Sequence, residues 1–271
     1  MKHSGLFRND WNVPDARATV ILMHGHGEHS TRYAYTAAGF NARGYRVISG
    51  DLPGNGRSPG LRGHIDNYAE YLEIVEAWVN EVLQMSDAGE RLFILGHSAG
   101  GLIVTRYLQT LAAQGRDVPF HGAILSSPAF RLKMHVPAWK AIMGRALNHI
   151  VPRLTMPSGL RKLNVTRHPD ISKVREDDPL MVHVASVRYY NEMLQAQQAA
   201  MLEASLIRLP FMLLHGGTDV IADPETSLQF ASKISSSDKV IQVLPGLNHE
   251  ILNEPERDEV IRDMADWLDL H

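Results

Sequence analysis

The sequence of 271 residues contains no cysteine, which excludes disulfides, cysteine-ligated metal sites and a cysteine nucleophile. It has no apolar run of the roughly 18 residues that cross a bilayer, and its N-terminus lacks the apolar core of a signal peptide. We therefore expect a cytoplasmic protein. The net charge of −3 gives no indication of a nucleic-acid partner. Hydrophobic residues make up 44% of the chain, enough for a sizeable core.

Short aliphatic runs alternate with longer stretches of helical spacing, which is typical of a parallel sheet covered by helices on both faces. The predicted strands are Thr19–Met23, Arg46–Ser49, Leu92–Leu95, Ala123–Leu125, Phe211–Leu214 and Val240–Leu244. The predicted helices are Thr31–Ala42, Tyr68–Met85, Gly100–Ala113, Pro224–Ile234 and Glu256–Leu268. The pattern predicts a single α/β domain over residues 1–271.

The alternation stops after Ser127, and strand character returns only at Pro210. We interpret residues 130–205 as a helical cap, inserted after the strand that ends near Ser126 and lying over the carboxyl edge of the sheet. The alternative is one irregular covering helix with long loops. That alternative would leave roughly 75 residues with little structure, which is unusual in a compact domain.

The segment GHSAGG at 96–101 matches the pattern G-x-S-x-G and stands between a predicted strand and a predicted helix. In such a strand–turn–helix the serine occupies a strained backbone position, so its neighbours must be small. Gly96, Ala99 and Gly100 meet this requirement. Backbone N–H groups at the start of the helix lack partners and can face a developing oxyanion. The segment therefore predicts Ser98 as a nucleophile.

A serine nucleophile needs a base and an acid that orients it, and in this arrangement they follow in the order Ser, Asp or Glu, His. Asp219 follows one predicted strand in HGGTD, and His249 follows the next in PGLNH. Both loops are at the edge where Ser98 emerges, so we predict Asp219 as the acid and His249 as the base. Asp223 is predicted to be a helix N-cap and is the alternative acid. His97 is expected to point away from the reacting face of the serine.

The first predicted strand ends in MHGHGEH at 23–29. Its turn places the N–H of His26 to form an oxyanion hole with the N–H of Ala99. Alternatively, the closely spaced histidines resemble the H-x-H-x-D-H zinc motif of metallo-β-lactamase-type hydrolases. That interpretation requires further ligand histidines and leaves Asp219 and His249 without a role, so we predict no metal and no cofactor. Asp51, in DLPGNGRS, is predicted to fix its loop through backbone hydrogen bonds.

The chain resembles the monoacylglycerol lipase and lysophospholipase branch of the α/β hydrolases, also described as serine aminopeptidase S33-like or Hydrolase_4. The resemblance spans nearly the whole length and rests on HGHGEHSTRY, DLPGNGRSPGLRGH, GHSAGG, LSSPAF, HGGTD and LNHEILNEPER. It implies the α/β-hydrolase fold, a triad of Ser98, Asp219 and His249, and oxyanion amides of His26 and Ala99. The implied substrate is a lipid-like ester, a monoacylglycerol or a lysophospholipid. In one departure, Ala99 stands where many members have methionine.

Two other functions stay open. A peptidase of the proline iminopeptidase type would need acidic groups in the cap to hold a substrate amine. A non-catalytic binding protein of the same fold would usually lack a member of the triad.

The predicted cap is basic, with ten lysines and arginines and one acidic residue, Asp170, between Arg131 and Arg175. Within it, one helical face carries Trp139, Ile142, Met143, Ala146, Leu147 and Ile150, and Lys140 and Arg145 lie off that face. A basic amphipathic helix with tryptophan is typical of interfacial binding. We expect the apolar face to cover an acyl pocket. For the charge, peripheral contact with an anionic membrane and a solvated outer surface are both open.

Overall fold

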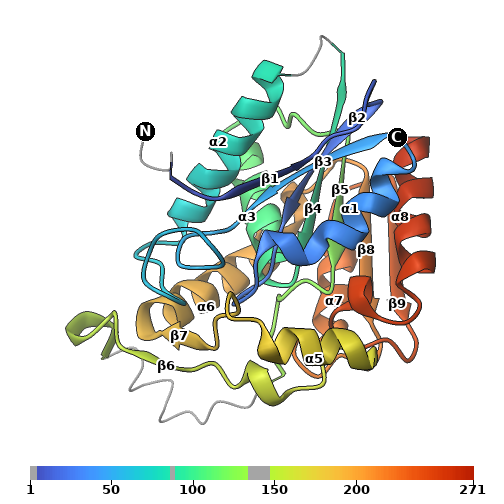
Figure 1. Ribbon diagram of the computed structural model, residues 1–271. Helices are drawn as coiled ribbons and strands as arrows, with labels where there is room; N and C mark the ends of the chain where they lie inside the picture. The colour runs from blue at the N-terminus through green and yellow to red at the C-terminus, as the bar shows by residue number, and fades with distance from the viewer. Residues whose placement is uncertain (1–4, 86–88, 134–146) are drawn as a thin grey trace.

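The computed structural model describes residues 5–85, 89–133 and 147–271, arranged around a seven-stranded sheet (Figure 1). The strand order is β1-β3-β2-β4-β5-β8-β9, with β1 antiparallel to β3 and all other neighbours parallel. The strands are β1 (Arg8–Trp11), β2 (Ala18–Met23), β3 (Tyr45–Gly50), β4 (Arg91–His97), β5 (Gly122–Ser126), β8 (Phe211–Gly216) and β9 (Lys239–Leu244). All six predicted strands are present, with small differences at their ends.

Strand β1 has no counterpart among the predicted strands. Its sequence, RNDW, is mostly polar and shows no alternation that would indicate a strand. It pairs at the edge of the sheet, from Arg8 opposite Gly50 to Trp11 opposite Val47. Its position is therefore decided by the neighbouring strand and not by its own composition.

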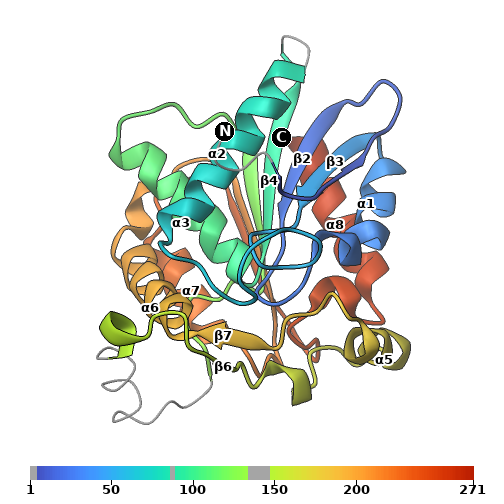
Figure 2. The same ribbon diagram turned by 60° about the vertical axis from the view of Figure 1, so that its left-hand side comes forward.

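The helices form a layer on each face of the sheet, because successive side chains of a strand point to opposite faces (Figure 2). Val20 and Leu22 of β2 belong to a core that includes Trp267. Ile21 and Met23 belong to the core on the other face. The layer on the Trp267 side contains α1 (Ala34–Asn41) and α8 (Arg257–Leu270), and the layer on the other side contains α2 (Ala69–Met85), α3 (Ala99–Ala113) and α7 (Pro224–Lys233). Two short 3-10 turns are η1 (Ser30–Tyr33) and η4 (Ile251–Asn253).

The insertion between β5 and β8 contains two strands where the sequence predicts none. Its elements are β6 (Thr155–Pro157), η2 (Leu160–Lys162), α5 (Pro169–Asp177), β7 (Val184–Ser186), α6 (Val187–Leu202) and η3 (Ala204–Leu206). Strands β6 and β7 pair antiparallel, with Thr155 opposite Ser186, near the carboxyl edge of the sheet (Figure 2). Each of these strands has only three residues, and its partner lies far away along the chain, so neither shows a local periodicity. The prediction that the insertion contains no strand was wrong for this reason.

The insertion has two parts. Helix α6 packs on α3, where Gln109 Nε2 donates to Ala200 O at 2.8 Å, and on the segment after β5, where Gln197 Nε2 donates to Ala129 O at 2.8 Å. Helix α5 and the β6–β7 pair extend over the sheet edge (Figure 1). The helix predicted around Trp139–Ile150 falls mostly on residues 134–146, outside the described residues. Among the residues that the structure describes, no helix is long and apolar enough to cross a membrane.

Candidate active site

Ser98 stands at a sharp turn between β4 and α3. Its φ of 53° and ψ of −118° lie in a region that a serine rarely adopts. The turn is tight: a Cβ added at Gly96 would lie 2.5 Å from Gly100 O, and one added at Gly100 would lie 2.1 Å from Met23 O. Only glycine fits at these two positions, which agrees with the elbow that the sequence predicts.

The structure brings together the three side chains predicted from the order of the motifs. His249 Nε2 lies 2.9 Å from Ser98 Oγ, and His249 Nδ1 lies 2.6 Å from Asp219 Oδ2. Ser98, Asp219 and His249 follow β4, β8 and β9, so all three loops lie at the carboxyl edge of the parallel sheet. Each of the three residues is buried, and this arrangement suits proton transfer from a serine hydroxyl to an imidazole.

The carboxylate of Asp219 takes part in four hydrogen bonds. Its Oδ1 accepts from the backbone amides of Ile221 at 2.7 Å and Ala222 at 3.0 Å. Its Oδ2 contacts His249 Nδ1 and also His215 Nε2, at 3.0 Å. Burial would raise the pKa of Asp219, but His249 and His215 outweigh it and hold the pKa well below its usual value. The carboxylate therefore stays charged beside the imidazole.

His215 is a residue of the site that the sequence analysis missed. Its Nδ1 lies 2.8 Å from Ser227 Oγ, so the ring is fixed between α7 and Asp219. The only signal in the sequence is its place at the end of β8, four residues before the predicted acid. This spacing alone does not predict a contact, because only the folded loop brings the side chains of His215 and Asp219 together.

Asp223, the alternative acid, does not reach His249. It caps α7, where its Oδ1 accepts from Glu225 N at 3.1 Å, and it forms an ion pair with Arg131. The structure thus places Asp223 as the N-cap that its position before Pro224 indicates.

His26, in the loop after β2, and Ala99, at the start of α3, line one cavity together with Ser98. Ala99 is the first residue of α3, and N–H groups of the first helical turn have no acceptor within the helix. The His26 ring stacks on Tyr189, with centroids 4.3 Å apart. Burial lowers the pKa of His26 to about 4, so the ring is neutral.

His97 lies closer to the site than the sequence analysis expected. It lines the same cavity as Ser98, and its ring packs against His249 with centroids 5.0 Å apart. Burial lowers the pKa of His97 to about 4, and its Nδ1 lies 3.0 Å from Ser126 Oγ. A neutral ring beside His249 adds no positive charge that would oppose protonation of the base.

Ser98 opens into a cavity of about 660 Å³, within the range of small-molecule sites. Much of the lining is apolar and comes from the insertion, including Met156, Leu160, Val187, Met193 and Leu194. Charged side chains also line it, namely Glu28, Arg32, Arg131, Arg175 and Glu250. The cavity therefore offers both an apolar and a charged lining to a molecule bound at the serine.

The family model described as Serine aminopeptidase, S33 (Hydrolase_4) matches residues 14–256, which include Ser98, Asp219 and His249. The chain belongs to this family. The phospholipase YtpA of Bacillus subtilis is 32% identical over 96% of this chain and 98% of its own length. A monoacylglycerol lipase of Mycolicibacterium smegmatis is 29% identical over 95% of this chain and 90% of its own length.

Solved structures show the same α/β-hydrolase architecture. The monoacylglycerol lipase of Paleococcus ferrophilus superposes with a TM-score of 0.87 and 34% identity, over 97% of this chain and 98% of that one. A soluble variant of the monoglyceride lipase of Saccharomyces cerevisiae, in complex with a substrate analog, gives a TM-score of 0.83 and 27% identity, over 97% and 91% of the two chains. The predicted fold class and the resemblance to this branch of the family are confirmed.

In this S33-family chain the histidines of the HGHGEH segment do not converge on one point. His24 Nδ1 lies 2.7 Å from Gly25 O, and His29 Nε2 lies 2.7 Å from Asp178 Oδ2. His26 stacks on Tyr189. Within the described ranges, no three histidine or carboxylate side chains are grouped as metal ligands. The segment instead shapes the loop beside Ser98.

Asp51 has the role that its motif predicts. Its Oδ1 accepts from Ser30 N at 2.7 Å, and its Oδ2 accepts from Arg57 N at 2.8 Å. The carboxylate thereby connects the loop after β3 to the loop after β2. It makes no hydrogen bond to Ser98, Asp219 or His249.

A second Ser–His–Asp arrangement, which the sequence analysis missed, lies where the insertion meets the main domain. His64 Nδ1 lies 2.7 Å from Ser186 Oγ, and His64 Nε2 lies 3.0 Å from Asp66 Oδ1. Ser186 caps α6, and the amides of Val187 and Arg188 donate to carbonyls of the insertion. No amide of this helical turn is therefore left for an oxyanion, and the contacts anchor the insertion.

Proposed function

We propose that this S33-family protein is a serine esterase that hydrolyses lipid-like esters of glycerol with one acyl chain, monoacylglycerols or lysophospholipids. The observation that carries the proposal is the contiguous Ser98–His249–Asp219 contact in a cavity with much apolar lining. The names of similar proteins, monoacylglycerol lipase and phospholipase, support the lipid-ester class. Both single-acyl substrates combine an apolar chain with a polar leaving alcohol.

In the proposed reaction, Ser98 Oγ attacks the ester carbonyl carbon while His249 Nε2 takes the hydroxyl proton. The amides of His26 and Ala99 stabilise the negative charge on the carbonyl oxygen. The C–O bond of the ester then breaks, and His249 gives its proton to the leaving alcohol. Water attacks the acyl-enzyme by the same steps and releases the fatty acid. Asp219 orients the imidazole and stabilises its protonated form throughout.

We assign the acyl chain of the substrate to the apolar part of the cavity. The inserted segment, residues 130–205 in the predicted boundaries, supplies Met156, Leu160 and Met193 to the apolar part. We propose that it serves as the cap of the acyl pocket. This assignment follows from polarity, because an alkyl chain loses no hydrogen bonds in such surroundings.

The charges in the cavity argue against a peptidase that recognises a free amine. Glu28 and Glu250 both line the cavity, but Arg32 donates to both carboxylates. Arg175 Nε also lies 3.5 Å from Glu250 Oε1. Neither carboxylate is therefore available to pair with a substrate ammonium group.

A fluorophosphonate probe tests the nucleophile directly. We expect it to label wild-type protein at Ser98, and we expect Ser98→Ala and His249→Ala to fold but lose turnover. Substrate class follows from a hydrolysis panel of monoacylglycerols, lysophospholipids, diacyl lipids and short p-nitrophenyl esters. The proposal fails if Ser98→Ala keeps more than about a hundredth of the wild-type kcat. It also fails if no single-acyl lipid is hydrolysed faster than its diacyl counterpart.

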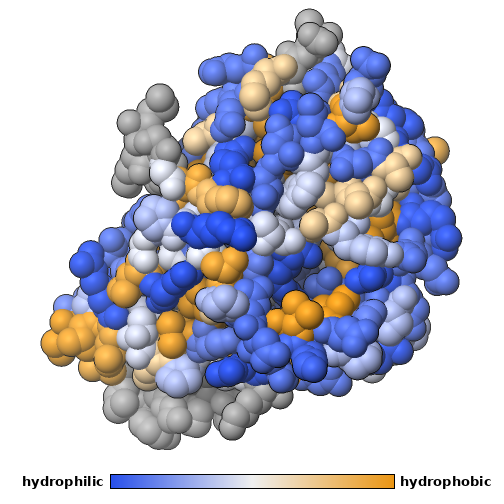
Figure 3. All heavy atoms as spheres, viewed as in Figure 1, coloured by the Kyte–Doolittle hydropathy of each residue, from blue (hydrophilic) through white to orange (hydrophobic). Residues whose placement is uncertain are grey.

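We further propose that the insertion makes peripheral contact with an anionic lipid surface. Ile150, Leu154 and Met156 are exposed by 75%, 48% and 51% of their area, and all three lie within seven residues of the chain. Figure 3 shows hydrophobic surface gathered at this end of the molecule. Arg153 lies in the same stretch of chain; its side chain is 70% exposed, and its Nη2 lies 3.5 Å from Oδ2 of the exposed Asp66. Adjacent apolar and basic groups are what an anionic bilayer surface attracts.

Vesicle sedimentation tests this contact. The protein should bind anionic vesicles at low salt more than neutral ones. Binding should fade as salt shortens the screening length from about 10 Å at 0.1 M to about 3 Å at 1 M. Ile150→Ser with Leu154→Ser should weaken binding, whereas Leu202→Ser, which changes a leucine that is 84% exposed outside the cluster, should not. Equal sedimentation with neutral and anionic vesicles at low salt would refute the proposal.

A further inference from the structure

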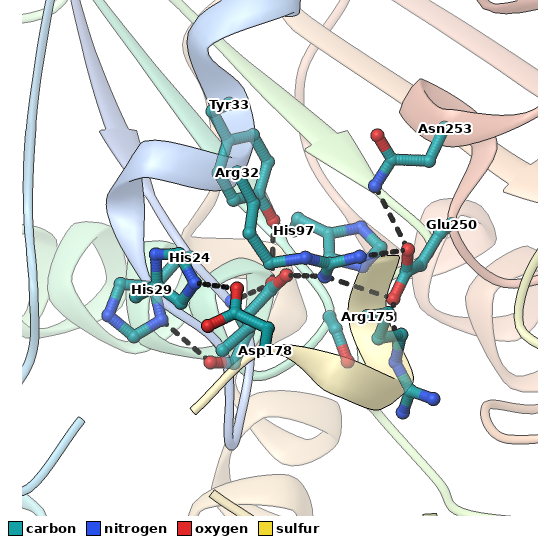
Figure 4. A network of polar contacts seen from close by, with 12 residues as sticks. His24, His29, Arg32, Tyr33, His97, Arg175, Asp178, Glu250 and Asn253 are labelled. Carbon is teal, nitrogen blue, oxygen red and sulfur yellow. Dashed lines mark hydrogen bonds and ion pairs between the residues drawn. The ribbon is translucent and has the colours of Figure 1, made fainter. Parts of the chain in front are cut away.

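Arg32 occupies an unusual position for an arginine, because it is buried between two loops of the site. It lies in η1, just after the loop that carries His26, and its side chain is only 9% exposed. Its Nη1 donates to Glu28 Oε2 at 2.5 Å. Its Nη1 and Nη2 donate to Glu250 Oε1 and Oε2 at 3.1 and 2.7 Å. One guanidinium thus joins two carboxylates that are far apart in the sequence (Figure 4).

Glu28 connects this guanidinium to the oxyanion loop. Its Oε1 accepts from Gly25 N at 2.6 Å and from Tyr33 Oη at 2.6 Å. Gly25 directly precedes His26, so the carboxylate fixes the residue that sets the direction of the His26 amide. A carboxylate with four acceptor sites can hold the backbone amide, the phenol and the guanidinium at once.

His24 holds the next peptide unit, Gly25–His26. Its Nε2 accepts from Leu52 N at 2.9 Å, which assigns the ring proton to Nδ1. Nδ1 then donates to Gly25 O at 2.7 Å. Since Gly25 O and His26 N–H belong to one planar peptide unit, the His26 amide cannot rotate without breaking this bond.

Glu250 connects the guanidinium to the loop of the base. It directly follows His249, and its own N–H donates to Val165 O at 2.8 Å. Asn253 Nδ2 donates to Glu250 Oε2 at 2.9 Å, and Arg175 approaches from α5 (Figure 4). The bidentate bond from Arg32 has a fixed geometry, because guanidinium and carboxylate are both planar.

The charges in this network stabilise one another strongly. Burial would raise the pKa of Glu28, but Arg32, the two neighbouring histidines and the Tyr33 hydroxyl together hold it well below its usual value. Burial would lower the pKa of Arg32, but Glu250 and Glu28 hold it above its usual value. Buried charges of this kind persist only when their partners stay in place.

We propose that Arg32 is a positioning residue that holds the oxyanion loop and the histidine loop in a fixed relation, through Glu28 on one side and Glu250 on the other. This inference rests on the proposed function of Ser98, His249 and the His26 amide. Arg32 acts on the reaction through the backbone of Gly25–His26 and His249–Glu250. Its loss changes the distance between the oxyanion donor and the base, and small displacements of such groups slow catalysis strongly.

The test compares Arg32→Lys with wild type on a short soluble p-nitrophenyl ester. Lysine keeps the charge but cannot make the bidentate bond. We expect kcat to fall at least about tenfold with KM within about twofold of wild type. Affinity for a boronic acid, which forms a tetrahedral adduct on the serine, should fall by a similar factor. If Arg32 served only in folding, the folded variant would keep the kcat and the boronic acid affinity of wild type.

Arg46→Lys is the matched control. Arg46 also makes a bidentate contact, to Asp10, with Nε at 2.9 Å and Nη2 at 2.5 Å, and its side chain is 15% exposed. It lies near the start of β3, at the amino ends of the parallel strands, whereas the site lies at their carboxyl ends. We expect kcat and boronic acid affinity of this variant to match wild type.

Glu250→Gln and the double variant with Arg32→Lys complete the design. The double variant should be no slower than the slower single variant, because both changes break the same link. If Arg32→Lys does not fold, Glu250→Gln decides: an unchanged kcat overturns the proposal. Retention of wild-type kcat in folded Arg32→Lys also overturns it. Wild-type protein whose Ser98 resists the fluorophosphonate would instead overturn the proposed function.

Discussion

Replacing Asp219 with asparagine should reverse the proton arrangement at His249 while leaving the fold in place. Two backbone amides, those of Ile221 and Ala222, donate to Oδ1. The asparagine must therefore place its carbonyl oxygen there and its NH2 group at the Oδ2 position. That NH2 group faces His249 Nδ1 and His215 Nε2, where the carboxylate had accepted.

Both imidazoles can adapt by changing tautomer. With Nδ1 of His249 forced to accept, its proton moves to Nε2, which faces Ser98 Oγ at 2.9 Å. The ring then cannot take the serine proton. His215 can move its proton to Nδ1 and donate to Ser227 Oγ, so no buried group loses its partner. The loss should be confined to catalysis.

The wrong tautomer in a serine triad costs about 10,000-fold in kcat, which corresponds to about 5 kcal/mol of transition-state stabilisation. We therefore expect Asp219→Asn to lower kcat on a soluble ester by about this factor, with KM and the urea midpoint nearly unchanged. Asp223→Asn, at the N-cap of α7, should keep kcat within about twofold. Asp219→Asn with more than about a tenth of wild-type kcat would refute the reasoning, as would a larger loss in Asp223→Asn.

Three further predictions concern stability and chemistry. Burial lowers the pKa of His26 and of His97 to about 4 from the ordinary 6.5, so the unfolded chain binds more protons between these pH values. The free energy of unfolding should fall as pH drops from 6.5 to 4, by about 3 kcal/mol for each histidine. In urea unfolding measured over this pH range, His97→Gln should show a weaker dependence of the free energy of unfolding on pH than wild type. Gly100→Ala should destabilise the fold by about 3 kcal/mol or more, because its Cβ would lie 2.1 Å from Met23 O. Gly5→Ala, with no atom within 4 Å of the added Cβ, should leave Tm unchanged, and equal Tm values for the two variants would contradict this account. Activity should survive exhaustive chelation and thiol reagents; loss with EDTA that zinc restores would revive the metal interpretation of HGHGEH.

The predicted parts of the site depend on short-range signals. Buried parallel strands are aliphatic runs, and glycines at 96 and 100 mark a turn that no larger residue fits. Once the strands are parallel, their carboxyl ends share one edge, so the order of Ser98, Asp219 and His249 places them near one another. The sequence alone therefore predicts which three side chains meet, and the structure adds the two hydrogen bonds between them.

Other features depend on pairing between distant segments. Strand β1 is mostly polar and exists because β3 offers an edge, and β6 and β7 have only three residues each. The approach of His97 to His249 follows from how the end of β4 packs against the loop after β9, and α6 packs on α3 although it belongs to the predicted cap. None of these contacts has a periodicity that a single stretch of sequence could show.

The buried charged residues are the feature of the site that the sequence does not predict and the tertiary structure does show. The sequence presents Glu28, Arg32 and Glu250 as ordinary charged residues near motifs, and charged side chains are by default exposed. Only the tertiary structure brings Arg32 against Glu250, 218 residues along the chain, and leaves less than a tenth of either side chain exposed. The sequence determined the buried parallel strands, the elbow and the order of the reacting groups, because these depend on local sterics and chain direction. The fold decided which charges are buried together, because their energy depends on partners that no local pattern specifies.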